Sequence, residues 1–461
     1  MHWANFIHIY QPAAQKPVWV KRIADDSYRK IFSGLRGIKR AKLTLNINGV
    51  LCELLDQAGA RDVLDDIKKL IDGGNLEITG SAKYHAFLPL LPEEEIERQI
   101  ILNEQALNKY FGGNWKGGGF FPPEMAYSKK VAEAAKKLGY KWIIVDEMAF
   151  PAGKRFSRGT VYEIEGVKDF FVFFRERNLT FKILSAPVAG ALPGILNFLE
   201  PRFGKDEYTV TAMDGETFGH HRPGLENLFF ELLKEERIKP STISEILNNF
   251  KKREIIDPRP STWASMPRDF KINQPYFRWR DKDSVLQNSQ WELLYLAVEA
   301  VKRDEKQKTR EALDKAMHSD QFWWSSARPW WSLEWIERGA HDLREIIKNS
   351  ETASEEEKQK AEELYKNIVY TGFEWQRTGR VDEISRSENE EIRERLEEKE
   401  KMFITKGEYE EMIKTMTEQM RLAAKSEEYH RAASLKDRIR ELQEEMERGG
   451  PAEKKANDLM F

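Results

Sequence analysis

The segment Met213–His221, MDGETFGHH, holds the first candidate for a catalytic side chain in this sequence. A run of β-type residues, Tyr208–Ala212, leads into an Asp-Gly-Glu turn that is soon followed by two histidines. In α/β barrels chemistry concentrates where strands open into loops, because the strand holds the loop backbone in place. We therefore interpret Asp214 as a candidate catalytic carboxylate, which needs a partner elsewhere in the chain.

The best partner is Glu124, in GGGFFPPEMAYS at residues 117–128. Three glycines and two prolines give the backbone an unusual course around a short apolar run, and a lone acid follows them. Glycoside hydrolysis uses such a pair, one carboxylate to attack the anomeric carbon and one carboxylic acid to protonate the leaving oxygen. Asp146 and Glu147 form a competing pair, but side chains adjacent on a strand diverge, so we expect only one of them near a site.

Both acids follow strands in a pattern that alternates apolar β-type runs with amphipathic helices as far as about residue 215, which is typical of a parallel α/β fold. The expected strands are Trp3–Ile9, Lys42–Ile47, Leu76–Ile78, Gly118–Phe121, Trp142–Val145, Phe170–Phe174 and Tyr208–Ala212. The expected helices between them are Ala60–Ile71, Glu93–Tyr110 and Lys129–Leu138. Seven strands favour an incomplete barrel, whose strand ends would bring polar side chains to one face.

After the seventh strand the pattern becomes helical, with aromatic-rich loops at 261–270, 276–281 and 319–335. The expected helices are Leu225–Glu236, Ser241–Phe250, Ser284–Arg303 and Thr309–Met317. Aromatic faces above polar groups are typical of sugar sites, although tryptophan pairs also pack helices together. We predict a catalytic barrel over 1–223 and a helical domain over 224–376 whose aromatic loops face the rim of the site.

The rest of the chain differs in composition. A polar segment, Arg377–Arg386, is interpreted as a linker, and residues 387–447 are highly charged with a helical period. Within 408–446 the apolar residues recur at spacings of three and four and are interrupted at Lys425–Tyr429, which predicts two short helices joined by a turn. So small a block buries little surface alone, so we expect a helical partner or self-association, with a solvated helix as the alternative.

Composition narrows the classes of function. The 461 residues contain no apolar run of the roughly 18 residues that a membrane span needs, and the N-terminal residues enter a strand pattern directly, which favours a cytoplasmic protein. The single cysteine, Cys52, excludes an intrachain disulfide and a cysteine-based zinc site. The 74 basic and 77 acidic side chains nearly balance, which argues against nucleic acid as the main ligand.

Four motifs resemble, in order, those of glycoside hydrolase family 57, the α-glucan-active group of amylases, 4-α-glucanotransferases and branching enzymes. They are HIYQP (8–12), GNLEITGSAKYH (74–85), GFFPPE (119–124) and DGETFG (214–219), and the resemblance runs from Met1 to about Trp375. It implies an incomplete (β/α)7 barrel followed by a helical bundle, a retaining mechanism, and no metal or cofactor. Glu124 would be the nucleophile and Asp214 the acid/base, with a raised pKa that keeps it protonated.

With this resemblance, substrate contacts are expected from nine side chains: His8, Gln11, Glu77, His85, Glu216, His220, Trp263, Trp323 and Trp324. Two positions depart from the family pattern, because Tyr10 stands where a second histidine is usual and Phe121 replaces the usual tryptophan. Both would touch the sugar, so they bear on the identity of the substrate more than on the reaction. The tail 408–446 separately resembles the UVR motif, a helical hairpin that pairs with partner helices in nucleotide-excision-repair proteins.

The sequence thus predicts a retaining α-glycoside hydrolase or transglycosylase that acts on α-glucans or maltooligosaccharides. Two alternatives remain open. A metal-dependent polysaccharide deacetylase would need an ion held by His8, His85, Asp146 and His220, whose spacing matches no compact ligand motif. A non-catalytic glucan-binding or assembly protein would have a degenerate barrel and would use the hairpin to recruit a partner.

Overall fold

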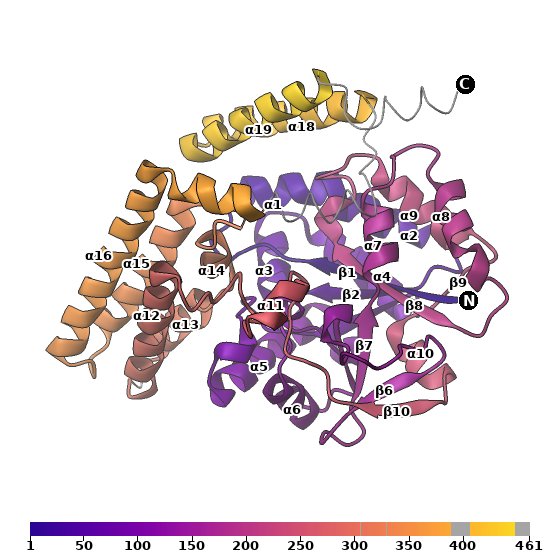
Figure 1. Cartoon of the computed structure of the whole chain (residues 1–461), viewed down its shortest axis with the longest axis horizontal. Helices are drawn as coiled ribbons and strands as arrows, with labels where there is room; N and C mark the ends of the chain where they lie inside the picture. The colour runs from indigo at the N-terminus through magenta and orange to yellow at the C-terminus, as the bar shows by residue number, and fades with distance from the viewer. Residues whose placement is uncertain (305, 329, 389–405, 448–461) are drawn as a thin grey trace.

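The computed structural model describes residues 1–304, 306–328, 330–388 and 406–447. The barrel is one curled sheet with the strand order β10-β6-β7-β5-β4-β3-β2-β1-β8, to which β9 adds by pairing with β1. A helical domain stands beside the barrel, and a helical hairpin lies across the top of the molecule (Figure 1). The predicted fold class, an incomplete barrel followed by a helical domain and a hairpin, is confirmed.

Seven parallel strands form the centre of the sheet, and each corresponds to one of the seven predicted strands. They are β1 (His2–Ile9), β2 (Leu43–Ile47), β3 (Leu76–Gly80), β4 (Lys116–Phe120), β5 (Trp142–Asp146), β7 (Phe171–Arg175) and β8 (Tyr208–Asp214). Their order, β7-β5-β4-β3-β2-β1-β8, makes every neighbouring pair parallel. Parallel strands all end at one edge, so the residues after them meet there.

Three short strands were not predicted. β6 (Val161–Ile164) runs antiparallel to β7, β10 (Arg253–Ile256) pairs with β6, and β9 (Lys239–Pro240) pairs with β1. Strands of two to four residues are too short to show a period in the sequence. The sheet therefore continues beyond residue 223 into a segment that we had assigned to the helical domain.

The helices around the barrel follow the expected alternation. They are α1 (Pro17–Ile23), α2 (Arg29–Arg36), α3 (Gly49–Gln57), α4 (Arg61–Asp72), α5 (Glu93–Phe111), α6 (Lys129–Lys137), α7 (Arg177–Leu184), α8 (Leu192–Leu199), α9 (Leu225–Lys234) and α10 (Ile243–Asn249), with a π-helical turn η1 (Ala24–Tyr28). The side chain of Ser128 accepts a hydrogen bond from the Val131 amide and so caps α6, as its sequence indicates. We missed α1 to α3, α7 and α8, which have seven to nine residues and so show little period.

One end of the barrel is closed by α10. Ile243 and Ile246 join the apolar cluster inside the sheet, beside Phe6, Trp142 and Val210. The cluster fills the lumen with large side chains, as in other small barrels. Because α10 sits under the amino-terminal ends of the strands, only the carboxyl-terminal ends remain available for a site.

The helical domain consists of α11 (Pro267–Lys271), α12 (Val285–Lys302), α13 (Gln307–Ala316), α14 (Asp320–Trp324), α15 (Leu333–Asn349) and α16 (Glu355–Thr378). Its core includes the stacked rings of Trp291 and Phe322, whose centroids lie 4.1 Å apart. This core continues into α5 and α6 of the barrel, so the two parts share one apolar cluster. Among the described residues, none of the helices combines the length and the apolarity required to cross a membrane.

The C-terminal hairpin consists of α18 (Lys406–Lys425) and α19 (Tyr429–Glu447), which break where the sequence indicates. The segment that we expected as an irregular linker is different, because residues 380–388 are helical. The helix is held at its end by Glu388, which is 2% exposed and forms ion pairs with Arg268 and Arg278. Buried charges of this kind are stable only when paired, so they fix the segment against α11 and the loop before α12.

Candidate functional site

Glu124 lies at the carboxyl end of β4, in the short helical turn η4 (Pro123–Met125). Its φ of 63° is in the left-handed region, which is unusual for a residue with a side chain and has to be imposed by the surroundings. Part of that constraint is a backbone hydrogen bond, because the Trp263 amide donates to the Glu124 carbonyl at 3.0 Å. The proline-rich segment and the loop 261–265 thus fix the backbone conformation of Glu124.

The carboxylate of Glu124 accepts two hydrogen bonds from the far side of the site. Trp263 Nε1 donates to Oε2 at 2.9 Å, and Ser319 Oγ donates to Oε1 at 3.0 Å. Burial raises the pKa of Glu124 to about 8, and the negative charges of Asp320 and Asp214 add to that rise. The two hydrogen bonds stabilise the ionised form and therefore oppose this rise in the pKa.

Asp214 ends β8, beside His8 of β1 in the parallel register. Its side chain is exposed, yet desolvation by the surrounding strand ends raises its pKa to about 6, against the attraction of Arg175. Asp214 ends β8 and Glu124 follows β4, and the parallel strands of the sheet all end at the same edge. The structure therefore brings the two candidate carboxylates to the same end of the sheet.

Glu216 forms a buried network just after Asp214, in the turn η7 (Gly215–Thr217). Its Oε1 accepts hydrogen bonds from the hydroxyl of Tyr28, from Gln11 Nε2 at 3.3 Å and from the Tyr10 amide at 3.3 Å. Burial and the neighbouring charge of Asp214 raise the pKa of Glu216 to about 7. Gln11 and Glu216, both predicted as substrate contacts, thus bond to each other and tie the ends of β1 and β8 together.

Stacked rings line the space beside Glu124. His8 lies against Phe121 and His85, with centroid distances of 4.7 and 5.1 Å, and Tyr10 stacks on His85 at 4.1 Å. Trp263 meets His8 edge-on at 5.9 Å. Burial lowers the pKa of His85 to about 4, so this ring is neutral at ordinary pH. Both departures from the family pattern, Tyr10 and Phe121, therefore belong to this aromatic group.

Asp320 is a site residue that the sequence reasoning missed. It begins α14, and its Oδ2 accepts hydrogen bonds from the Tyr10 hydroxyl at 2.8 Å and from His318 Nδ1 at 3.1 Å. Contact with His318 holds the pKa of Asp320 below its usual value in spite of burial. In the loop SDQFWWSS (319–326) the tryptophans suggested substrate contacts, and the acid next to Ser319 was the available signal for Asp320.

Arg175, at the end of β7, is a second missed residue. Its guanidinium lies between the rings of Phe181 and Trp263, at 5.2 and 5.8 Å from their centroids, and pairs with Asp146 at 3.5 Å. Asp146 also pairs with Arg177 at 2.8 Å, so this carboxylate is occupied in structural ion pairs. Arg175 supplies the positive charge that limits the rise in the pKa of Asp214.

Glu77 does not join the site. It is the second residue of β3, so it lies at the amino-terminal end of the sheet, where its Oε1 accepts from Thr44 Oγ1 at 2.8 Å and from the Ser244 amide at 3.1 Å. Ser244 belongs to the first turn of α10, whose free amides favour a carboxylate. Because Glu77 is the second residue of β3, the structure does not bring this predicted sugar contact to the end of the sheet that holds Glu124.

Three further predicted contacts lie elsewhere. His220 is buried, and its Nδ1 is 3.0 Å from Oδ2 of Asp26 in η1. Trp323 packs against Trp279, with centroids 5.0 Å apart, and Trp324 meets Trp330 at 6.3 Å, all within the helical domain. These ring contacts agree with the alternative interpretation of the aromatic pairs, packing between helices and loops, while both indoles remain half-buried.

The four residues that a deacetylase metal site would need are also separated. His8 and His85 stack in the site, whereas Asp146 is bound by two arginines and His220 is bound by Asp26. Within the part of the chain that the structure describes, no group of three or more His, Cys, Asp or Glu side chains is arranged to hold a metal ion. The geometry favours a site of carboxylates and rings.

Comparison with known proteins gives two family matches. The model of "Glycosyl hydrolase family 57" matches residues 8–259, and the "UvrB/uvrC motif" matches residues 410–445. The first match covers more than half of the chain and includes all four motifs of the sequence resemblance. No curated protein matches the chain by sequence.

Three solved structures show the same fold. The 4-α-glucanotransferase from Thermococcus litoralis is 20% identical, with a TM-score of 0.63, covering 75% of this chain and 59% of that protein. The GH57-type branching enzyme from Pyrococcus horikoshii is 18% identical, with a TM-score of 0.59 and coverages of 80% and 95%. The α-amylase AmyC from Thermotoga maritima is 15% identical, with a TM-score of 0.55 and coverages of 84% and 95%. The chain thus spans about three fifths of the glucanotransferase.

The role of Glu77 predicts a loss of stability on truncation. Glu77→Ala removes the acceptor of the Thr44 and Ser244 hydrogen bonds and should lower the free energy of unfolding by about 1–3 kcal/mol. Glu77→Gln keeps an acceptor oxygen and should lose less. Urea unfolding of the three proteins measures this. A Glu77→Ala protein as stable as the wild type would contradict the assignment.

Replacement of the buried acid Glu124 should instead raise the stability of the protein, by an amount that depends on pH. Its pKa of about 8 lies above the unfolded value of about 4.3, so the native state holds a proton that the unfolded state has lost between these pH values. The free energy of unfolding of the wild type therefore falls as pH rises through this window. The Glu124→Gln variant has no acid at this position and lacks this pH dependence. The stability of the variant relative to wild type should grow from pH 5 to pH 8.

Urea unfolding at pH 5, 6, 7 and 8 measures this difference. The exposed Asp72, changed to Asn, is a control that should shift little across the series. A difference between Glu124→Gln and wild type that stays constant over the whole range would show that Glu124 is ionised in the folded protein.

Proposed function

Because the chain belongs to glycosyl hydrolase family 57, we propose that it cleaves or transfers α-glucosidic linkages of α-glucans by a retaining double displacement. Family membership makes it a glycoside hydrolase or transferase. The glucan substrate is supported by the names of the similar structures, a glucanotransferase, a branching enzyme and an amylase. The observation that carries the mechanism is the placement of Glu124, fixed by Trp263 and Ser319 and electrostatically coupled to Asp214.

In the first step, the Glu124 carboxylate attacks the anomeric carbon and forms a covalent glycosyl ester. The bond to the leaving oxygen breaks, and Asp214 gives its proton to that oxygen. In the second step, Asp214 takes a proton from water or from an acceptor sugar hydroxyl, whose oxygen attacks the anomeric carbon and releases Glu124. Water gives hydrolysis and a sugar acceptor gives transfer, while the configuration is retained in both cases.

The proton of the unliganded site starts on the wrong acid for this reaction. With pKa values of about 8 for Glu124 and about 6 for Asp214, Glu124 holds the proton in most singly protonated molecules. The form with Glu124 ionised and Asp214 protonated is therefore the minor one. Trp263 and Ser319 donate to the carboxylate and stabilise this reactive form.

The stacked rings provide a surface for the sugar. His85 Nε2 is buried and has no hydrogen-bond partner among the described residues, so a substrate hydroxyl would satisfy it. Trp263 presents a half-buried indole next to Glu124, and ring faces favour the axial C–H groups of a pyranose. We therefore assign substrate contacts to His8, Tyr10, His85 and Trp263, and a positioning role to Gln11 and Glu216.

Replacement of either acid tests the proposal. Glu124→Gln should lower kcat on a maltooligosaccharide by at least about 10³-fold, and Asp214→Asn by about 10²–10⁴-fold, because each removes one half of the double displacement. Product analysis by chromatography gives both rates and the products, and longer as well as shorter chains would reveal transfer. Both variants should keep the wild-type circular dichroism. A wild type that binds glucan without product would instead indicate the non-catalytic alternative.

Rescue by azide distinguishes the roles of the two acids. In Glu124→Ala, azide enters from the face that the carboxylate has vacated, so an activated α-glucoside should give the β-glucosyl azide. In Asp214→Ala, the glycosyl ester still forms, and azide then displaces Glu124 to give the α-glucosyl azide. NMR of the two products decides between them. The opposite pair of configurations would exchange the roles of Glu124 and Asp214.

The two pKa values predict a bell-shaped pH profile of kcat/KM. Below about pH 6 both acids are protonated and no nucleophile is present, and above about pH 8 both are ionised and no proton donor remains. Activity should therefore rise through pH 6 and fall through pH 8. Initial rates from pH 4.5 to 9.5 at low substrate measure both limbs. A falling limb below pH 7 would contradict the raised pKa of Glu124.

A further inference from the structure

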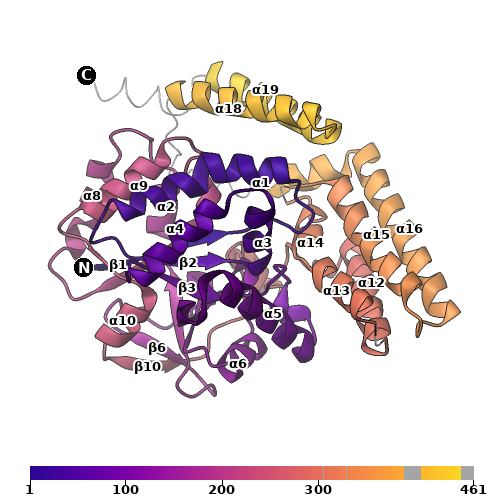
Figure 2. The ribbon, with the colours of Figure 1, turned by 180° about the vertical axis from the view of Figure 1, so that it is seen from behind.

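The C-terminal hairpin lies along the outside of the barrel, over α1 (Figure 2). Trp19 of α1 is fully buried beneath it, and its indole Nε1 donates to the Glu428 carboxylate at 2.9 and 3.0 Å. The guanidinium of Arg431 covers the same ring at 3.7 Å from its centroid, and Lys16 pairs with Glu428 at 3.1 Å. The beginning of α19 is therefore bound to α1 by an aromatic residue and opposite charges.

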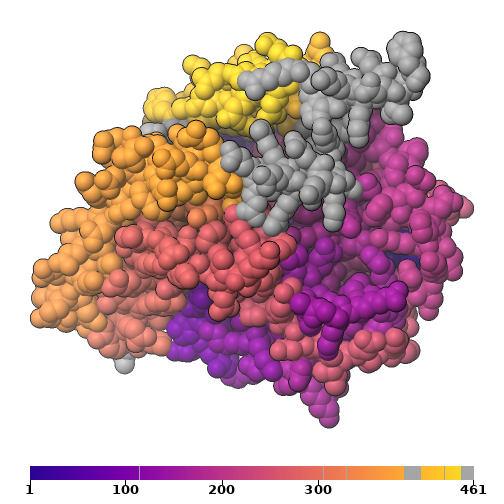
Figure 3. All heavy atoms as spheres, in the orientation of Figure 1, coloured from indigo at the N-terminus to yellow at the C-terminus, as the bar shows by residue number. Residues whose placement is uncertain are grey.

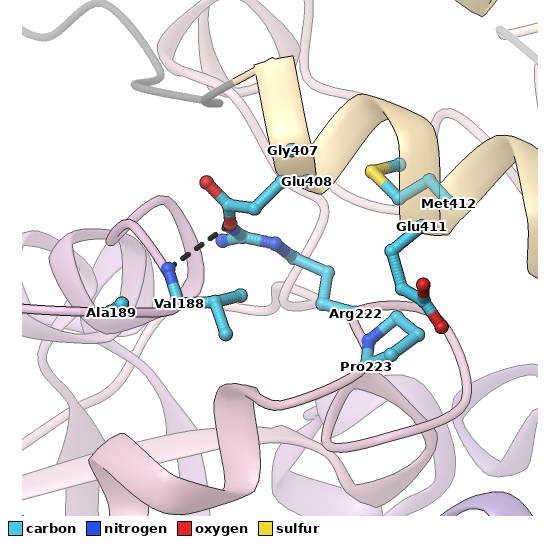
Figure 4. A pocket seen from close by; sticks show the side chains of 8 residues that line it. All are labelled: Val188, Ala189, Arg222, Pro223, Gly407, Glu408, Glu411 and Met412. Carbon is cyan, nitrogen blue, oxygen red and sulfur yellow. Dashed lines mark hydrogen bonds and ion pairs between the residues drawn. The ribbon is translucent and has the colours of Figure 1, made fainter.

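The other helix of the hairpin reaches the loop that follows β8. Glu408 Oε1 accepts from Arg222 Nη2 at 2.5 Å and from the Val188 amide at 3.1 Å (Figure 4). Each side chain of this ion pair is only 11% exposed. A shielded pair of this kind is strongly disrupted when one partner is removed, because the other charge is left buried.

A second set of charges connects the hairpin with the same loop. Glu418 of α18 pairs with Arg22 at 2.9 Å, Arg22 pairs with Asp26 at 2.7 Å, and Asp26 lies 3.0 Å from His220 Nδ1. His220 is two residues before Arg222 in the sequence. Two acids of α18, ten residues apart, are thus tied to neighbouring positions of one loop.

This loop, residues 215–224, directly follows Asp214 and contains Glu216. The Arg222 amide donates to the Thr217 carbonyl at 3.0 Å, and the His221 amide donates to the Glu216 carbonyl at 2.9 Å. Glu216 comes two residues after Asp214 and is bonded to Gln11. Arg222 and Glu216 therefore belong to one hydrogen-bonded turn.

One side of the loop packs closely on η1. Gly219 has a φ of 96°, and a Cβ atom there would stand 2.1 Å from the carbonyl oxygen of Asp26. Only glycine fits this contact, so the loop backbone lies directly on η1. The hydroxyl of Ser27, also in η1, donates to the Gly215 carbonyl at 2.8 Å. The loop is held between η1 on one side and the hairpin on the other.

The contact between hairpin and loop consists more of charges than of apolar packing. Beside the Arg222–Glu408 pair there is a cavity of about 270 Å³, with Val188, Pro223 and Met412 among its walls (Figure 4). The hairpin lies over the surface at the top of the molecule (Figure 3). Its pairs Lys16–Glu428 and Arg22–Glu418 are partly exposed, so salt screens them.

We propose that Arg222 and Glu408 are positioning residues, through which the docked hairpin holds the loop 215–224 in the arrangement that catalysis requires. The activity part of this proposal rests on the proposed function. The hairpin is then a part of the enzyme that acts from outside the site, through the residues that follow Asp214. Release of the hairpin lowers turnover, and its return restores it.

Charge reversal tests the proposal in the full chain. Arg222→Glu and Glu408→Arg should each lower kcat/KM by about 10-fold or more and should speed amide hydrogen exchange in residues 215–224. The double variant restores opposite charges at the pair and should return kcat/KM to within about threefold of wild type. Matched controls are Arg438→Glu and Glu441→Arg, an exposed pair within α19, which should change neither quantity.

The outcomes separate positioning from mere stabilisation. If the single variants loosen residues 406–447 while kcat/KM stays within twofold of wild type, the hairpin does not serve the site and the proposal is overturned. The same holds if the double variant fails to restore exchange protection. The rising limb of the pH profile, near pH 6, reports the ionisation of Asp214. A shift of this limb at unchanged melting temperature supports positioning. If the wild type turns over no glucan, the proposed function fails, and exchange in residues 215–224 alone then decides the proposal.

Discussion

The site depends on the burial of one carboxylate, that of Glu124, between two parts of the chain. The barrel supplies the acid at the end of β4, whereas its hydrogen-bond donors, Trp263 and Ser319, come from the segments after the barrel. Desolvation raises the pKa of Glu124, and these donors limit that rise. The helical domain therefore does more than cover the site, since without it the acid would lack the groups that stabilise its ionised form.

Crowding of acids is the second constraint. Glu124, Asp214 and Glu216 all have raised pKa values at one end of the sheet, and the charge of Asp214 contributes to two of these rises. Such a cluster costs stability, and it persists because a rigid barrel holds the strand ends. Arg175 moderates the cluster from the end of β7. The arrangement provides acids that exchange protons near neutral pH, which is what two-step glycosyl transfer needs.

The two ends of the parallel barrel have different roles. At the amino-terminal end, α10 closes the lumen, and Glu77 binds the amide of Ser244 in its first turn. At the carboxyl-terminal end, the loops are free to carry chemistry and to contact the helical domain and the hairpin. The loop after β8 takes part in the site and in the contact with the hairpin, because Glu216 bonds to Gln11 while Arg222 pairs with Glu408.

By itself, the sequence determined the seven parallel strands, the acids Glu124 and Asp214 that follow two of them, and the two helices of the hairpin. Each of these is a local pattern, an apolar run with a turn or a helical period, and local patterns are legible in the chain. Only the tertiary structure decided that Asp320, Ser319 and Arg175 join the acids, and that Glu77 lies at the other end of the sheet. It also decided that Trp323 and Trp324 contact other tryptophans of the helical domain. These outcomes depend on contacts between residues far apart in the chain, which no local pattern encodes.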